Sequence, residues 1–257
     1  MRVLFRIMLI VIFIIYGNCK NLRSLFGLDK PNHVLLNASS IGDLTGIKLA
    51  LSQGAYVNAT DNENGSTALM LASQKGYYEI VNMLLEKDRI DIFVKDYNGI
   101  TAFMLASKNG YIETINSLLE KSADYNAKDN DGWTALMYAS DQGHTEVVKL
   151  LLKRKIDIDS KDKNGWTALM LATQKNFIEI VDLLHKKGAN INNQDNTHAT
   201  PLMVASQNGY ADLVKLLLSK KADFNLKTKE NITALKLAQE NNQSTIVDML
   251  KKSGANE

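Results

Sequence analysis

The chain has 257 residues, a formal net charge of +2 and 45% hydrophobic residues. These values exclude a disordered chain, and the mixing of lysines with acidic residues along the chain argues against a nucleic-acid-binding stripe. The single cysteine, Cys19, leaves no disulfide to form within the chain, so packing alone must hold the fold.

The first residues differ from everything that follows. Arg2 and Arg6 precede an unbroken apolar run at residues 7–16, and small or polar residues come next. This layout is typical of a secretory signal peptide, and the run is short against the ~20 residues that a membrane-spanning helix needs. We therefore predict a signal peptide at residues 1–19 and a linker at residues 20–31. An uncleaved membrane anchor is the alternative.

Cys19 lies directly after the apolar run, where precursors of bacterial lipoproteins carry the cysteine that is lipidated. The resemblance is partial, because Tyr16 and Asn18 stand where such signals usually have leucine and a glycine or alanine. Two interpretations stay open: Cys19 is lipidated, or it is incidental in a discarded leader. A lipid chain would hold the protein at a membrane surface without a spanning helix. Both interpretations predict an exported protein that is periplasmic, membrane-tethered or extracellular.

After this segment, one motif recurs at a spacing of 33 or 34 residues. Its six copies are Ser66–Met70, Ile100–Met104, Trp133–Met137, Trp166–Met170, Thr200–Met203 and Thr233–Lys236. A fixed period of this size indicates a solenoid, in which each unit buries its apolar face against its neighbours. Such an array offers an extended binding surface rather than a closed catalytic pocket.

The unit at residues 129–161 shows how each copy is expected to fold. Asp129–Gly132 has the composition of a tight turn, and Thr134 follows as the N-cap of a first helix. Gly143 ends that helix. A second helix opens at Glu146, and its apolar residues recur three to four positions apart, which predicts one face packed into the stack.

The motif and its spacing resemble the ankyrin-repeat family from about Asn32 to Glu257. The resemblance implies an all-α solenoid of about seven helix–turn–helix units with short hairpin-like turns. The expected units are residues 32–60 as N-terminal cap, 61–95, 96–128, 129–161, 162–194, 195–227, and 228–257 as C-terminal cap.

The chain departs from the family pattern at two places. Thr-Pro-Leu-His of the family reads Thr-Ala-Leu-Met in most copies here. We expect an apolar methionine contact to replace the polar contact of the histidine, since methionine adapts its shape well. His198 and Asn231 replace the turn glycine in two late units, which predicts looser turns there.

No motif for catalysis, cofactor binding or metal binding is present. Ser160–Lys163 matches a Ser-x-x-Lys pattern, but its companion motifs are missing. The four histidines lie in separate units, and His144 takes a position that other units fill with an aromatic side chain. We therefore predict a protein that is not an enzyme, uses no cofactor or metal and binds no nucleic acid.

The position just before the motif threonine suggests a binding surface. Trp133 and Trp166 occupy it in consecutive units, and Ile100 occupies it one unit earlier. In the ankyrin family, turn tips and the exposed side of the first helix typically contact the partner. The resemblance implies the following partner-binding residues: Tyr97, Ile100, Asn130, Asp131, Trp133, Asp141, Lys163, Asn164, Trp166 and Gln174. The alternative is that each tryptophan braces its neighbour's turn.

The sequence thus predicts a monomeric, non-catalytic scaffold that binds another protein. Membrane contact is expected only through a lipid on Cys19 or an uncleaved anchor. The alternative function is an inhibitor or effector that acts on a specific host or envelope enzyme.

Overall fold

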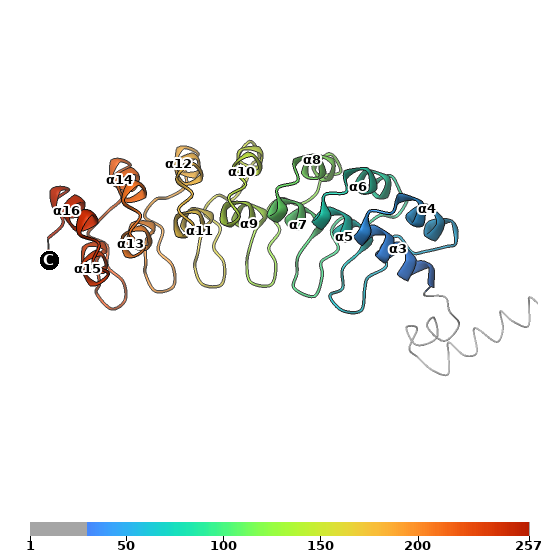
Figure 1. Cartoon of the computed structure of the whole chain (residues 1–257), viewed down its shortest axis with the longest axis horizontal. Helices are drawn as coiled ribbons and strands as arrows, with labels where there is room; N and C mark the ends of the chain where they lie inside the picture. Colours follow the sequence, from blue (N-terminus) through green and yellow to red (C-terminus); the bar gives the residue numbers. More distant parts are fainter. Residues whose placement is uncertain (1–29, 257) are drawn as a thin grey trace, which may run out of the picture.

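A computed structural model describes residues 30–256, which fold as a curved, two-layered array of fourteen helices (Figure 1). The predicted signal peptide, including Cys19, lies outside the described residues. The first described helix begins at Lys30, inside the expected linker, because Pro31 is tolerated in a first helical turn. Among the described helices, none is both long enough and apolar enough to cross a bilayer.

The helices alternate between two layers. The first helices of the units are α3 (Lys30–Ile41), α5 (Ala68–Lys75), α7 (Ala102–Asn109), α9 (Ala135–Asp141), α11 (Ala168–Gln174), α13 (Pro201–Gln207) and α15 (Ala234–Glu240). The second helices are α4 (Leu44–Ser52), α6 (Tyr78–Leu85), α8 (Ile112–Glu120), α10 (Thr145–Leu151), α12 (Ile178–Lys186), α14 (Ala211–Ser219) and α16 (Ser244–Lys252). In Figure 1 the second helices line the convex side of the arch, and the long loops project on the opposite side.

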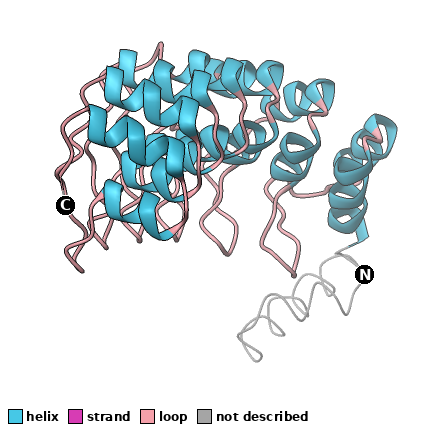
Figure 2. Cartoon of the chain, turned by 60° about the vertical axis from the view of Figure 1, so that its left-hand side comes forward, coloured by secondary structure: helices cyan, strands magenta, loops and turns pink. Residues whose placement is uncertain are grey.

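The array is all-α over the described residues, as expected. The only β pairing there is one isolated bridge between Thr60 and Thr67, and Figure 2 shows two layers of helices with loops along one edge. The loops stay out of a sheet because their hydrogen bonds are mostly local. In the unit at residues 129–161, for example, an Asp129 carboxylate oxygen accepts from the backbone N–H groups of Asp131 and Trp133, both at 2.9 Å.

The motif threonines cap the first helices. Thr134, for example, accepts from the N–H of Met137 at 3.3 Å, and the other five copies make the same contact. The methionine does more than the apolar packing that we expected. Sδ of Met70 and Sδ of Met137 each lie 3.4 Å from the N–H of the capping threonine, so a weak acceptor takes over the polar contact.

The core runs continuously between the two layers. In each of the six motif-bearing units, one leucine lies at the same position of the second helix and has no exposed surface: Leu84, Leu118, Leu151, Leu184, Leu217 and Leu250. Small buried residues on the first helices, such as Ala106 and Ala139, let neighbouring helices approach closely. Each unit therefore depends on its neighbours for most of its apolar contacts.

Aromatic side chains just before α6, α8, α10, α12 and α14 contact the preceding unit. Ring nitrogen Nε2 of His144 lies 2.9 Å from the carbonyl oxygen of Lys108, so this residue makes an inter-unit polar contact as well as packing. Its ring covers Gly110, where an added Cβ would lie 2.7 Å from Nδ1 of His144. Glycine therefore suits position 110, both for its positive φ and for this close approach.

Candidate protein-binding surface

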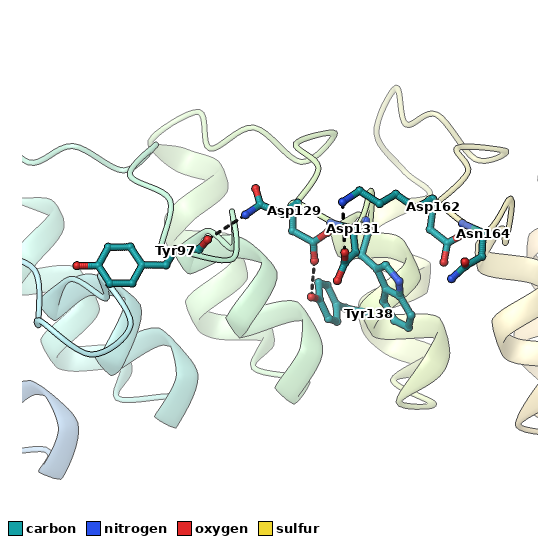
Figure 3. Close-up of polar contacts among 9 residues, drawn as sticks. Tyr97, Asp129, Asp131, Tyr138, Asp162 and Asn164 are labelled. Carbon is teal, nitrogen blue, oxygen red and sulfur yellow. Dashed lines mark hydrogen bonds and ion pairs between the residues drawn. The ribbon is translucent and has the colours of Figure 1, made fainter.

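The loop tips of three central units form a continuous polar ridge. We call residues 97–98, 130–131 and 163–164 the tip ridge (Figure 3). The N–H of Asn130 donates to the carbonyl of Asn98 at 2.8 Å, and its side-chain amide donates to the carbonyl of Tyr97 at 2.9 Å. The N–H of Lys163 donates to the carbonyl of Asp131 at 2.8 Å. These contacts hold the tips in register although they lie a full repeat apart in sequence.

The predicted tip residues lie on this ridge and face solvent. Tyr97 is 59% exposed, the largest exposure of a bulky apolar or aromatic side chain at the described tips. Asn130 and Asn164 are exposed as well. Asp131 and Lys163 form an ion pair at 3.6 Å between neighbouring tips, and both side chains are largely solvated. This pair contributes little to stability, since solvent screens it, but it fixes a pattern of charge.

Trp133 and Trp166 are not fully exposed, contrary to the expectation of an exposed row. Each is half-buried and packs against the hydrophobic core, and Ile100 does the same one unit earlier. The three residues, which we call the apolar row, lie beside the tip ridge. Carboxylate oxygens of the turn aspartates accept from the N–H groups of Trp133 and Trp166 at 2.9 and 2.8 Å. Each tryptophan therefore packs on the core while part of its surface stays accessible, and the binding role remains a prediction.

Tyr138 belongs to the same surface, and the sequence reasoning missed it. Its ring centroid lies 5.0 Å from that of Trp133, and its hydroxyl donates to Asp129 at 2.6 Å (Figure 3). The ammonium of Lys108 lies 5.4 Å from the centre of the tyrosine ring, which is a cation–π contact. Burial, followed by the hydrogen bond to Asp129, raises the pKa of Tyr138.

One signal in the sequence could have identified Tyr138. The equivalent position of the first helix holds an aliphatic residue in the other motif-bearing units: Leu71, Leu105, Leu171, Val204 and Leu237. A single tyrosine in an aliphatic column introduces a polar group that needs a partner, and the neighbouring turn aspartate provides it.

The two predicted residues at the ends of the first helices differ in accessibility. The Asp141 side chain is only 14% exposed and pairs with Lys175 of the next unit at 3.8 Å. The side-chain amide of Gln142 also donates to Asp141 at 2.6 Å. Gln174 is exposed, and its backbone carbonyl accepts from the hydroxyl of Tyr210 at 3.3 Å. Asp141 therefore shapes the surface through Lys175 more than through its own oxygens.

The isolated Ser-x-x-Lys match has no catalytic arrangement. Ser160 is buried, and Lys163 points its ammonium to Asp131 on the tip ridge. Within residues 30–256, no three His, Cys, Asp or Glu side chains are grouped so that they could hold a metal ion.

Comparison with known proteins defines the class. A family model described as "Ankyrin repeats (3 copies)" matches residues 10–96, 35–129, 103–195 and 193–257. The chain therefore belongs to the ankyrin-repeat family. Ankyrin repeats are in general non-catalytic scaffolds for protein–protein interaction.

Among solved structures, the chain is similar to the crystal structure of the ankyrin repeat domain of Bcl-3, a unique member of the IkappaB protein family. The two share 30% sequence identity with a TM-score of 0.73, over 85% of this chain and 97% of the other. No curated protein matches the sequence.

Proposed function

We propose that this protein is an exported ankyrin scaffold that binds another protein through the tip ridge and the apolar row. One observation supports the proposal most directly: large side chains fill the same position in three consecutive units, half-buried behind a solvated polar ridge. Protein interfaces commonly have this arrangement of a central aromatic anchor with a polar rim. Half-burial holds the rings in place before binding, so little side-chain entropy is lost on association.

The charges beside the apolar row alternate in sign. Asp131 pairs with Lys163 on the tips, and Asp141 pairs with Lys175 at the ends of the first helices. Lys108 adds a positive charge over the Tyr138 ring. A surface of alternating charge suits a partner with a matching alternating pattern better than a uniformly charged one, and such matching contributes mainly to specificity.

The test is affinity capture with the full chain, followed by calorimetry on the captured partner. Tyr97→Ala and Trp133→Ala should each weaken binding by about 2 kcal/mol, the scale of an interface anchor. Tyr97→Ala should leave the melting temperature unchanged because its side chain is exposed, whereas Trp133→Ala should also lower it. Tyr78→Ala, which truncates an exposed tyrosine on the second-helix layer, is the matched control. Unchanged affinity of the folded fraction in both variants would disprove the binding surface.

An inhibitor or effector of a specific host or envelope enzyme would use the same surface. The activity of the captured partner distinguishes this alternative from a passive scaffold. A scaffold leaves the partner's turnover unchanged at saturation, whereas an inhibitor reduces it in proportion to the fraction bound.

Export is the second part of the proposal, and the apolar run after Arg2 and Arg6 supports it. Mass spectrometry of the protein from its native cell should find the chain without residues 1–18 or 1–19. An acylated Cys19 at the new N-terminus would support tethering, and Cys19→Ala should then release the protein from membranes. An intact Met1 on soluble protein inside the cell would exclude export.

A further inference from the structure

The last four second helices end in clusters of basic residues. The clusters are residues 153–155, 186–187, 220–221 and 251–252, which contain eight lysines and one arginine and together form what we call the basic edge. All nine side chains are exposed except that of Lys220, which is half-buried. The first three second helices lack this feature: they end in Ser52–Gln53, Glu86–Lys87 and Glu120–Lys121, which carry no net charge.

The second helices α10, α12, α14 and α16 stack side by side, which brings their C-terminal ends into one line (Figure 1). Ion pairs connect neighbouring helices of this row. Lys149 of α10 pairs with Glu179 of α12 at 3.1 Å. Asp182 of α12 pairs with Lys186 at 2.6 Å and with Lys220, just beyond α14, at 3.0 Å. Among residues 30–256, Asp182 is the only acidic group that forms an ion pair with the basic edge. The other seven cations of the edge form no ion pair with a described acidic residue.

The helix dipole does not explain the basic edge. Lysines favour helix C-termini because of the partial negative charge there, but this effect acts equally on all seven second helices. Clusters confined to four consecutive units also repel one another across the stack, which slightly destabilises the fold. A ligand of opposite charge that covers several units at once would offset this repulsion.

We propose that the basic edge docks on the surface of a bilayer that contains anionic phospholipid. This inference rests on the proposed membrane tether at the N-terminus. Lysines carry compact charges on flexible stems and recognise anionic surfaces without a fixed geometry. The basic edge contains no aromatic side chain to anchor a peptide, and its charges follow a line rather than a pocket. These features fit a continuous anionic surface better than an acidic protein segment.

The bilayer contact would complement the lipid. A basic patch adds electrostatic attraction to anionic lipid, beyond the apolar insertion of an acyl anchor. Residues 20–29 lie between Cys19 and α3, and an extended chain of this length reaches up to about 35 Å, which lets the domain turn its basic edge to the membrane. The tip ridge lies beyond the first-helix layer, opposite the second helices, so it would stay accessible to a protein partner (Figure 1).

The test is co-sedimentation of the full chain with vesicles of phosphatidylcholine alone and of phosphatidylcholine mixed with phosphatidylglycerol. We expect preferential binding to the mixed vesicles that weakens as salt is added. In the triple variant Lys187→Glu, Lys221→Glu and Lys252→Glu, the affinity ratio between mixed and phosphatidylcholine vesicles should fall more than about tenfold. Each lysine near an anionic surface contributes about fivefold to binding. The matched control changes three exposed lysines elsewhere, Lys48→Glu, Lys75→Glu and Lys229→Glu, and should lose much less.

Three results would overturn the inference: no preference for mixed vesicles, an equal loss in the triple variant and its control, or charge-dependent binding to poly-glutamate without binding to mixed vesicles. Thermal melting of each variant confirms that it is folded. The leader is the same in the triple variant and its control, so the difference between them reports on the basic edge alone. Failure of the membrane tether is read separately, from Cys19→Ala in cells. Binding of a protein partner by the tip ridge is measured without vesicles, so that experiment tests the proposed function independently of the bilayer contact.

Discussion

At the scale of single residues, His198 has a backbone conformation that suits glycine better than histidine. Its φ is 66°, close to the φ of 76 to 86° at Gly65, Gly99, Gly132 and Gly165 in the equivalent turns. A side chain in this region costs roughly 1 kcal/mol or more, and less for asparagine. The sequence predicted a looser turn at His198. The structure instead keeps the turn in its glycine-like geometry, so the histidine backbone is strained.

Replacing His198 by glycine should therefore stabilise the protein. We expect His198→Gly to raise the free energy of unfolding by about 1 kcal/mol, measured by chemical denaturation. Asn231→Gly, at a φ of 63°, is the control and should gain less, because asparagine tolerates this conformation. Equal gains in the two variants would show that strain at the histidine is not the cause.

Tyr138 should make stability depend on alkaline pH. Its pKa is raised from 10.0 by burial and by the hydrogen bond to Asp129, so the folded state holds the proton more tightly than the unfolded state does. The resulting stabilisation is complete below the unfolded pKa of about 10 and is lost as pH rises through the folded pKa. At neutral pH, Tyr138→Phe should cost about 1 kcal/mol because Asp129 loses a donor.

The measurement is urea denaturation of the parent and Tyr138→Phe at neutral pH and above pH 10. The difference between them should shrink at the higher pH, since only the parent loses a phenol proton at this site. A constant difference would mean that the hydroxyl does not carry the pH dependence.

At the scale of elements, the first helices bury a row of hydroxyl groups against the second layer. Ser107 donates to the carbonyl of Phe103 at 2.8 Å, and Thr173 donates to the carbonyl of Leu169 at the same distance. The hydroxyls of Ser140 and Ser206 occupy equivalent positions, are fully buried, and have no hydrogen-bond partner among the described residues. These small side chains let the helices pack closely, but only some of the hydroxyl groups find a hydrogen-bond partner.

Alanine at these positions should therefore have different effects from unit to unit. Ser140→Ala and Ser206→Ala should leave the melting temperature unchanged or raise it, because a buried hydroxyl without a partner costs about 1 kcal/mol or more. Ser107→Ala should lower it, because a hydrogen bond is lost. The same decrease in all three variants would indicate that the three hydroxyls are equally satisfied in solution.

At the scale of the whole molecule, stability should depend on where in the array a change is made. Leu151 and Leu250 fill the same position of the second helix, and neither has exposed surface. Leu151 has units on both sides, whereas Leu250 lies in the last unit. In a solenoid each unit contacts only its neighbours, so an end unit can unfold without the rest.

Leu151→Ala should cost about 2–5 kcal/mol and lower the main unfolding transition. Leu250→Ala removes the same atoms, but we expect it to release mainly α16 and α15 while the main transition shifts little. Hydrogen exchange by mass spectrometry would locate the loss of protection. Uniform loss along the array in Leu250→Ala would mean that the protein unfolds as one cooperative unit.

The sequence by itself determined the local features of this protein. The period, the threonine caps, the turn aspartates and the positive-φ positions follow from contacts within about five residues, so the motif alone predicts them. The repetition of that motif then determines the family and the all-α solenoid.

Only the tertiary structure decided how the surface is formed. The half-burial of Trp133 and Trp166, the network around Tyr138 and the covering of Asp141 by Lys175 depend on side chains brought together by stacking. The alignment of the basic edge depends on the same stacking, across units that are 31 to 34 residues apart in sequence. The physical reason is that a repeat specifies its own turn and helices through local hydrogen bonds, whereas the exposure and charge of each position depend on the neighbouring unit that packs against it.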